Sequence, residues 1–254
     1  MREDETGQNF VLSIHPALNG ILKGLPESEL KDSLKRRLQS FIARTFLQSP
    51  ADLEQALAPH LWVLREANMR GLDLTPAGYI RPAEVKALAG LLPEMRQWTF
   101  PIEREVNTPP VLFFRHYLKD IGLLRKYKNS LKVSRLGKTL ASAPDLLWAE
   151  LARTLVLDTS EFEATVTALF LLYVGSEQTL KCSRDEILDI LLARGWRDGR
   201  GVPVDLFDLW DSFDWVETAL NSIGENSPSL TLNAQLLVRD ALFAVSVDDS
   251  GEWG

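Results

Sequence analysis

The sequence predicts a mainly α-helical protein with a few short β-strands, built from winged-helix-like units of helix, turn, strand and capped helix. Apolar residues recur every three to five positions over much of the chain, for example at Leu30, Leu34 and Leu38. This spacing places them on one face of a helix. Short tetrads of alternating apolar and polar residues interrupt the helical pattern, and such alternation is typical of strands.

The composition fits a globular protein. The chain has 254 residues, of which 45% are hydrophobic and 25% are charged, with a formal net charge of −7. These fractions exclude an intrinsically disordered chain, which combines low hydrophobicity with high net charge. Cys182 is the only cysteine, and this excludes a disulfide scaffold.

Most of the expected helices have a recognisable start. Ser49-Pro50 and Thr108-Pro109 each place a capping residue before a proline, which is favoured at the first helical position. Ser160 and Ser183 are each followed three residues later by Glu, the pattern of a capping box. We expect helices over residues 25–46, 50–64, 111–118, about 204–220 and about 234–245, and two more that begin after residues 160 and 183.

Three tetrads are the expected strands: Leu72–Thr75, Leu131–Ser134 and Leu230–Asn233. Each follows an expected helix and ends in Thr, Ser or Asn, which are good helix N-caps. We interpret the pattern as one degenerate unit used three times. On this interpretation residues 1–92 hold a helical region with the first unit, residues 93–110 form a linker, and residues 111–254 hold the second and third units.

Several segments also resemble a group of actinobacterial proteins. They are Leu72-Asp-Leu-Thr-Pro-Ala-Gly-Tyr-Ile-Arg-Pro-Ala-Glu-Val85, Asn107–Leu112, Gly122–Tyr127, Leu131–Gly137 and Asp145–Trp148. In combination they are similar to the transposon-passenger or plasmid-ORF-three-like proteins, over roughly residues 55–155. The resemblance implies an association with mobile elements and no characterised chemistry. The N-terminal plasmid-type domain of many members has no counterpart in this chain.

A cluster of cations lies within this acidic chain. Residues 119–138 hold seven Lys or Arg and one carboxylate, Asp120, which gives a net charge of +6. Clustered cations favour phosphate contact, because neutralising phosphates releases condensed counterions. The alternative is an ordinary solvated surface. The helix expected after Ser134 lacks Asn and Gln, the side chains that pair with adenine. The candidate nucleic-acid-binding residues are Lys119, Arg125, Lys126, Tyr127, Lys128, Lys132, Arg135 and Lys138.

An acidic and aromatic segment near the C-terminus is the candidate partner-binding site. Its carboxylates recur every third residue, with Leu206, Phe207, Leu209 and Trp210 between them. Such spacing keeps neighbours on one slowly drifting helix face. That face either binds a protein partner, docks on the basic cluster in the same chain or a second copy, or is simply solvated. The candidate residues are Asp205, Asp208, Asp211, Asp214 and Glu217.

No motif for catalysis or for a cofactor is apparent. The three histidines (His15, His60, His116) are not paired at helical spacing for zinc, and no phosphate-binding or nucleophile motif occurs. The acidic N-terminus differs from a signal peptide, and the longest apolar run, residues 168–174, is too short to span a bilayer. We therefore expect a cytoplasmic, non-enzymatic accessory protein without cofactor or metal, in contact with DNA rather than a membrane. A protein-interaction scaffold and a ligand-sensing regulator are the alternatives.

Overall fold

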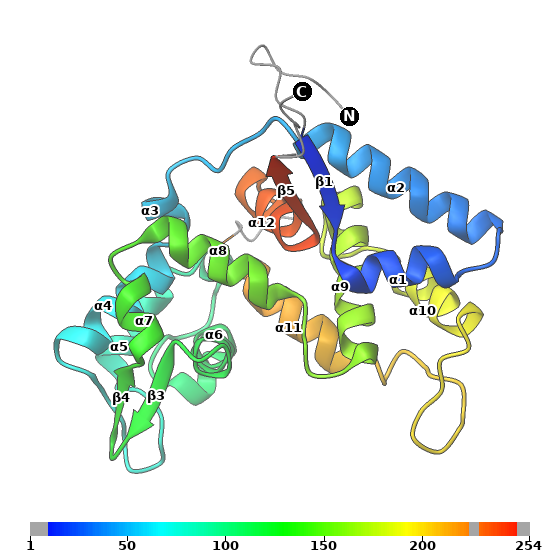
Figure 1. The fold of residues 1–254 in the computed structure, drawn as a ribbon. Coiled ribbons are helices and arrows are strands. Elements are labelled where there is room, and N and C mark those ends of the chain that lie inside the picture. Colours follow the sequence, from blue (N-terminus) through cyan, green and yellow to red (C-terminus); the bar gives the residue numbers. More distant parts are fainter. Residues whose placement is uncertain (1–9, 224–228, 248–254) are drawn as a thin grey trace.

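The computed structural model describes residues 10–223 and 229–247, and it confirms a mainly α-helical fold with short antiparallel strands (Figure 1). The helices are α1 (Pro16–Gly24), α2 (Glu29–Thr45), α3 (Leu53–Ala56), α4 (Ala58–Met69), α5 (Pro82–Ala89), α6 (Pro109–Asp120), α7 (Arg135–Leu140), α8 (Pro144–Leu155), α9 (Glu161–Glu177), α10 (Arg184–Ala193), α11 (Trp210–Asn221) and α12 (Leu232–Leu242). The strands are β1 (Phe10–Ile14), β2 (Leu72–Asp73), β3 (Leu124–Tyr127), β4 (Ser130–Val133) and β5 (Phe243–Val247).

One winged-helix unit spans α4 to β4. Its elements follow the order α4, β2, α5, α6, β3, β4, and its sheet has the strand order β2-β4-β3. The first and last strands therefore pair, with Leu72 opposite Leu131, and β3 and β4 form the hairpin called the wing. Two of the expected units are thus halves of a single unit, because their strands belong to the same sheet.

The prediction of a third strand, at residues 230–233, is wrong. The Leu230 N–H donates to the carbonyl of Gln178 at 2.7 Å, and the Thr231 hydroxyl caps α12 by accepting from the Ala234 N–H. Asn233, which we expected to be the cap, instead hydrogen-bonds both backbone groups of Ala51. The first unit also differs from expectation. Thr75 closes a turn with Tyr79, so that α5 begins seven residues later than Thr75.

The segment expected to be a linker, residues 93–110, connects α5 to α6 within the winged-helix unit. Its Glu105 is fully buried and forms an ion pair with Arg115 of α6. The same carboxylate accepts a hydrogen bond from the Ile80 N–H at 2.7 Å. An acidic side chain at this position thus joins three segments of one unit, which a flexible connection between two domains would not do.

The wing hairpin is fixed to α7 by a close backbone approach at Gly137. Ser134 caps α7 as expected, accepting from the Gly137 N–H at 2.9 Å. A Cβ atom placed on Gly137 would lie 2.4 Å from the carbonyl oxygen of Leu123. That oxygen accepts a hydrogen bond from Ser134, so the backbone on both sides is held in place.

We expect Gly137→Ala to destabilise the folded chain by about 1–3 kcal/mol, the usual cost of overpacking. Urea unfolding at pH 7 measures this change. The control is Gly199→Ala in an open loop, where the added Cβ meets no atom within 4 Å. Equal stabilities of the two variants would contradict the close contact.

The second part of the molecule surrounds α9. Residues 165–175 of α9 are all buried, and α1, α2, α10, α11 and α12 pack around it (Figure 1). A helix that is apolar on every side is a core helix. The Ser160 cap predicted for α9 is confirmed, because Ser160 accepts from the Glu163 N–H at 3.1 Å. Ser183 precedes α10 but makes no side-chain cap, and the Glu186 side chain pairs with Arg37.

Strands β1 and β5 join the two ends of the described chain. They pair in antiparallel fashion, with Phe10 opposite Val247 and Ile14 opposite Phe243. The helix expected to continue through Val245 therefore ends at Leu242. Within the two described ranges, no helix has both the length and the apolar character that crossing a bilayer requires.

Candidate nucleic-acid interface

The wing gathers part of the predicted basic cluster on one face of its hairpin. The guanidinium carbon of Arg125 lies 5.7 Å from the centre of the Tyr127 ring, and the Lys128 ammonium lies 5.6 Å from it. Contacts of this length between a cation and an aromatic face are mildly attractive. Lys128 adopts a φ of 52° at the turn, a left-handed conformation that non-glycine residues rarely take. The tip of the wing is thus an aromatic ring flanked by two cations.

Lys126 lies at the same tip and extends from the other side of the hairpin. It is paired with the buried Leu131, and residues on one strand alternate between the two faces of a sheet. Lys126 is nevertheless exposed, because it lies near the end of the strand. Among the described residues, no carboxylate comes within 4 Å of Arg125, Lys126 or Lys128.

The other predicted nucleic-acid-binding residues do not all lie on the wing. The Lys132 ammonium donates to the Arg70 carbonyl at 3.1 Å, at the end of α4. Lys119 lies on α6 beside Asp120, with 3.9 Å between their charged groups. Arg135 and Lys138 are exposed on α7, which follows the wing directly. The structure therefore places Arg125, Lys126, Tyr127 and Lys128 together, with the α7 pair next along the chain.

The sequence predicts helix α6 but not its place between β2 and the wing. In winged helices the helix that precedes the wing ordinarily enters the major groove, whereas the sequence pattern favoured the helix after Ser134. The exposed side chains of α6 include Phe113, His116, Lys119 and Asp120, of which only Lys119 is a side chain that ordinarily reads guanine. The strand order shows the place of α6 in the unit, which the pattern of a single strand does not specify.

The predicted acidic face divides into two structures. Asp205 and Asp208 close a turn, because Asp205 accepts from the Phe207 N–H at 2.8 Å and Asp208 accepts from the Asp205 N–H at 2.9 Å. Such side-chain bonds compete with helix formation, so the helix expected from residue 204 begins at Trp210.

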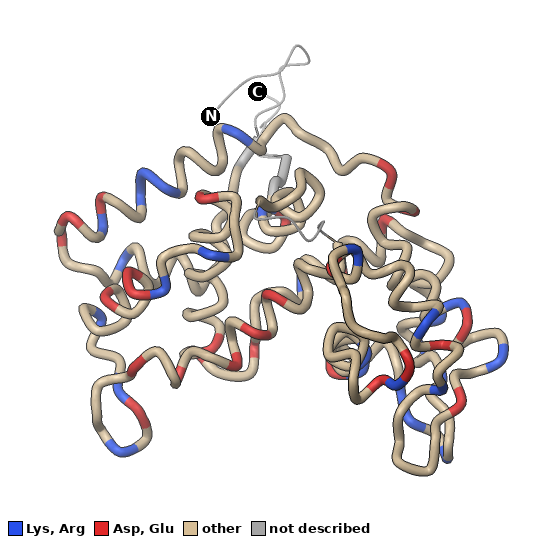
Figure 2. Tube along the Cα trace, turned by 180° about the vertical axis from the view of Figure 1, so that it is seen from behind, with Lys and Arg blue, Asp and Glu red and all other residues tan. Residues whose placement is uncertain are grey.

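Asp211, Asp214 and Glu217 do lie on α11, and Figure 2 shows carboxylates recurring along this helix. Glu217 is ion-paired with Arg184, and burial raises the pKa of its carboxyl. Asp211 and Asp214 are exposed and stand beside α6. The acidic set thus supplies two free carboxylates next to the recognition-helix position rather than one continuous face of five.

The other titratable groups are mainly structural. Burial raises the pKa of the Cys182 thiol to about 12 and lowers the pKa of His60 to about 3. His60 lies 3.2 Å from the Ser222 hydroxyl and packs its ring against the edge of Phe114. Among the described residues, no three His, Cys, Asp or Glu side chains form a group that could hold a metal ion.

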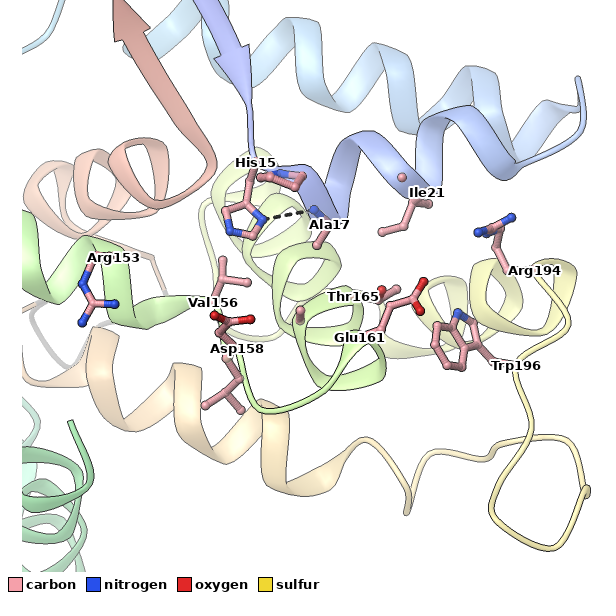
Figure 3. Close-up of a pocket in the computed structure, with 14 residues that line it drawn as sticks. His15, Ala17, Ile21, Arg153, Val156, Asp158, Glu161, Thr165, Arg194 and Trp196 are labelled. Carbon is pink, nitrogen blue, oxygen red and sulfur yellow. Dashed lines mark hydrogen bonds between the residues drawn. The ribbon is translucent and has the colours of Figure 1, made fainter. Parts of the chain in front are cut away.

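A pocket of about 500 Å³ lies in the other part of the molecule, between α1, the junction of α8 with α9, and the end of α10 (Figure 3). Its walls carry both signs of charge, from Arg153, Asp158, Glu161 and Arg194. Burial lowers the pKa of His15, and Asp158 opposes this effect. None of the predicted site residues lines this pocket, so it is separate from the candidate interface.

The fold and the interface together describe an α-helical protein that contains one winged helix with a cationic wing. Comparison of the chain with protein-family models, with curated proteins and with solved structures finds no match. The resemblance to transposon-passenger or plasmid-ORF-three-like proteins therefore stays a prediction.

Proposed function

We propose that this chain is a non-enzymatic accessory protein that contacts double-stranded DNA through its wing. The observation that carries the proposal is the group of three exposed cations, Arg125, Lys126 and Lys128, that have no carboxylate within 4 Å in the described chain. Unpaired cations need not give up an internal partner before they bind phosphate. Each phosphate that they neutralise releases condensed counterions.

The chemistry of the wing favours contact with the DNA backbone rather than with base edges. Lysine and arginine side chains on a hairpin tip fit phosphates of any sequence, and phosphate contacts position a protein without specifying a sequence. Helix α6 is poorly suited to the major groove, because Asp211 and Asp214 of α11 lie beside its exposed side and would repel phosphates. The exposed Lys119 of α6 lies 3.9 Å from Asp120. The proposal is therefore binding by the wing with little sequence preference.

The test is a fluorescence anisotropy titration of a labelled 24-base-pair mixed-sequence duplex, repeated over a series of salt concentrations. We expect the triple variant Arg125→Ala/Lys126→Ala/Lys128→Ala to bind more weakly. Its slope of log affinity against log salt should be shallower by about 2 to 3, because each lost phosphate contact reduces the slope by about 0.9.

The matched control removes three cations from elsewhere in the chain. Lys23, Arg36 and Lys181 are exposed and lie outside the winged-helix unit, so their triple alanine variant has the same net charge as the wing variant. We expect the control to keep the wild-type salt slope. Equal loss of affinity in both variants would mean that net charge, and not the wing, determines DNA binding. Absence of binding by the wild type at low salt would refute the proposal.

A further inference from the structure

The α6–α11 groove is a feature that the proposed function leaves unused. Two adjoining hollows of about 180 and 280 Å³ form it, and they share Phe113, Asp214 and Thr218 in their walls. The groove lies on the exposed side of α6, which carries Phe113, His116 and Asp120. Because α11 has 12 residues, it offers a length of about 18 Å, a little over three helical turns.

The base of the groove is rigid and aromatic. The rings of Tyr117 and Trp215 meet edge to face with their centroids 5.0 Å apart, and the Trp215 indole N–H donates to the Thr154 carbonyl at 3.2 Å. Phe113 lines both hollows and is 56% exposed. A large apolar side chain that stays exposed and is bordered by polar groups is typical of an interaction site.

The border of the groove is negatively charged. Asp120 comes from α6, where Lys119 lies 3.9 Å from its carboxylate, and Asp211 and Asp214 come from α11. In the part of the chain that the structure describes, no Lys or Arg lies within 4 Å of Asp211 or Asp214. Burial and the charges of Arg115 and Lys119 lower the pKa of His116, which favours its neutral imidazole. The groove therefore attracts cations and repels phosphates.

Apolar surface continues beyond the groove at the beginning of α11. Trp210 is 53% exposed and stands one helical turn before Asp214, and Phe207 in the preceding turn is 85% exposed. Trp210 and Asp214 thus lie on one side of α11, and the exposed Phe207 comes just before the helix begins. An aromatic surface with acidic neighbours is complementary to a segment that presents both apolar and cationic side chains.

We propose that the α6–α11 groove binds a Lys- and Arg-rich amphipathic helix of a partner protein. One apolar side chain of that helix rests on Phe113, and its cations pair with Asp211 and Asp214. A helix of three turns matches the length of the groove, and laying an apolar face into such a groove is a common mode of peptide recognition. The negative border excludes DNA as the occupant, and the charge pattern selects a basic partner.

The test uses the full chain and three labelled 14-residue peptides in anisotropy titrations. The first peptide has Lys and Leu at helical spacing, the second has Ser in place of each Leu, and the third has Glu in place of each Lys. We expect the first to bind measurably, the second more weakly because it lacks the apolar anchor, and the third not at all.

Variants locate the binding site. We expect Asp211→Asn/Asp214→Asn to weaken binding of the Lys/Leu peptide about tenfold, since two exposed ion pairs of ordinary strength are lost. Phe113→Ala should also weaken it severalfold. The matched controls are Asp145→Asn/Asp189→Asn, which removes two exposed carboxylates from other helices, and Leu47→Ala, which truncates an exposed apolar side chain. We expect changes below twofold for both controls.

Three results would overturn the inference. The first is equal weakening by the groove and control variants, and the second is equal binding of the Ser and Leu peptides. The third is a dimer, seen by light scattering, that Asp211→Asn/Asp214→Asn dissociates, because the occupant would then be a second copy of this chain. The groove and the wing are tested separately, since the wing variant should keep peptide binding and the groove variant should keep DNA binding.

Discussion

Replacing Glu105 with alanine is expected to destabilise the folded chain by about 3–5 kcal/mol, the cost of leaving a buried charge without its partner. The Glu105 side chain is fully buried, and that of its partner Arg115 is only 10% exposed. The substitution also leaves the Ile80 N–H without its acceptor. Because folded domains are stable by only about 5–15 kcal/mol, the winged-helix unit would lose much of its stability.

Urea unfolding of three variants separates the parts of this effect. Glu105→Gln keeps the size and an acceptor for Ile80 while it removes the charge, so we expect a smaller loss than for Glu105→Ala. The control is Glu54→Ala, which breaks an exposed ion pair with Arg65 and should cost less than about 1 kcal/mol. If Glu105→Ala costs no more than Glu54→Ala, the buried pair does not hold the unit together.

The contribution of His60 to stability is expected to fall by about 3 kcal/mol between pH 7 and pH 4. Burial lowers its pKa in the folded state to about 3, below the ordinary value of about 6.5. The unfolded chain therefore takes up a proton that the folded chain does not bind. Unfolding is favoured as the pH falls below about 6.5, and the effect levels off near pH 3.

Comparing the stability of the wild type with that of His60→Gln separates the titration of His60 from the titration of other groups. Such a comparison is needed because burial raises the pKa of Glu94 to about 7, and this carboxyl stabilises the fold as the pH falls from 7 toward 4.5. We expect the difference in unfolding free energy between wild type and His60→Gln to shrink by about 3 kcal/mol from pH 7 to pH 4. The exposed control His116→Gln should show a much smaller change. A constant difference for His60→Gln would contradict the buried neutral imidazole.

Local signals in the sequence were sufficient to predict many of the helices and two strands. The expected helix over residues 50–64 is wrong in its start and extent, because Asp52 caps α3 and a separate helix, α4, begins at Ala58. The Ser160 and Ser134 caps and the Thr108-Pro109 start are all present in the structure, although Thr108 makes no side-chain cap bond to α6. Such starts depend on residues within one turn, so their pattern is readable from the chain alone. Strand β3 was missed because three of its four residues are exposed, and its strand conformation comes from pairing with β4.

Contacts between distant or side-chain groups also override the local pattern at two other segments, the one after α12 and the one before α11. The sequence pattern predicts a helix that continues to residue 245, but pairing with β1 makes residues 243–247 strand β5. In the same way, Asp205 and Asp208 had the spacing of a helix face, and their bonds to backbone N–H groups close a turn instead. In each case a contact that sequence spacing does not record determined the conformation.

Three features are predictable from the sequence alone: the helical class of the fold, the caps that begin several helices and the identity of the cationic residues near the wing. Those features follow from short-range periodicity and from charge, which are properties of neighbouring residues. The tertiary structure is needed to show that two strand tetrads belong to one sheet and that α6 occupies the recognition-helix position. It also placed Asp211 and Asp214 beside Phe113, about 100 residues earlier in the chain. The physical reason is that strand pairing and groove formation join residues distant in sequence, and the local pattern of neither partner specifies the other.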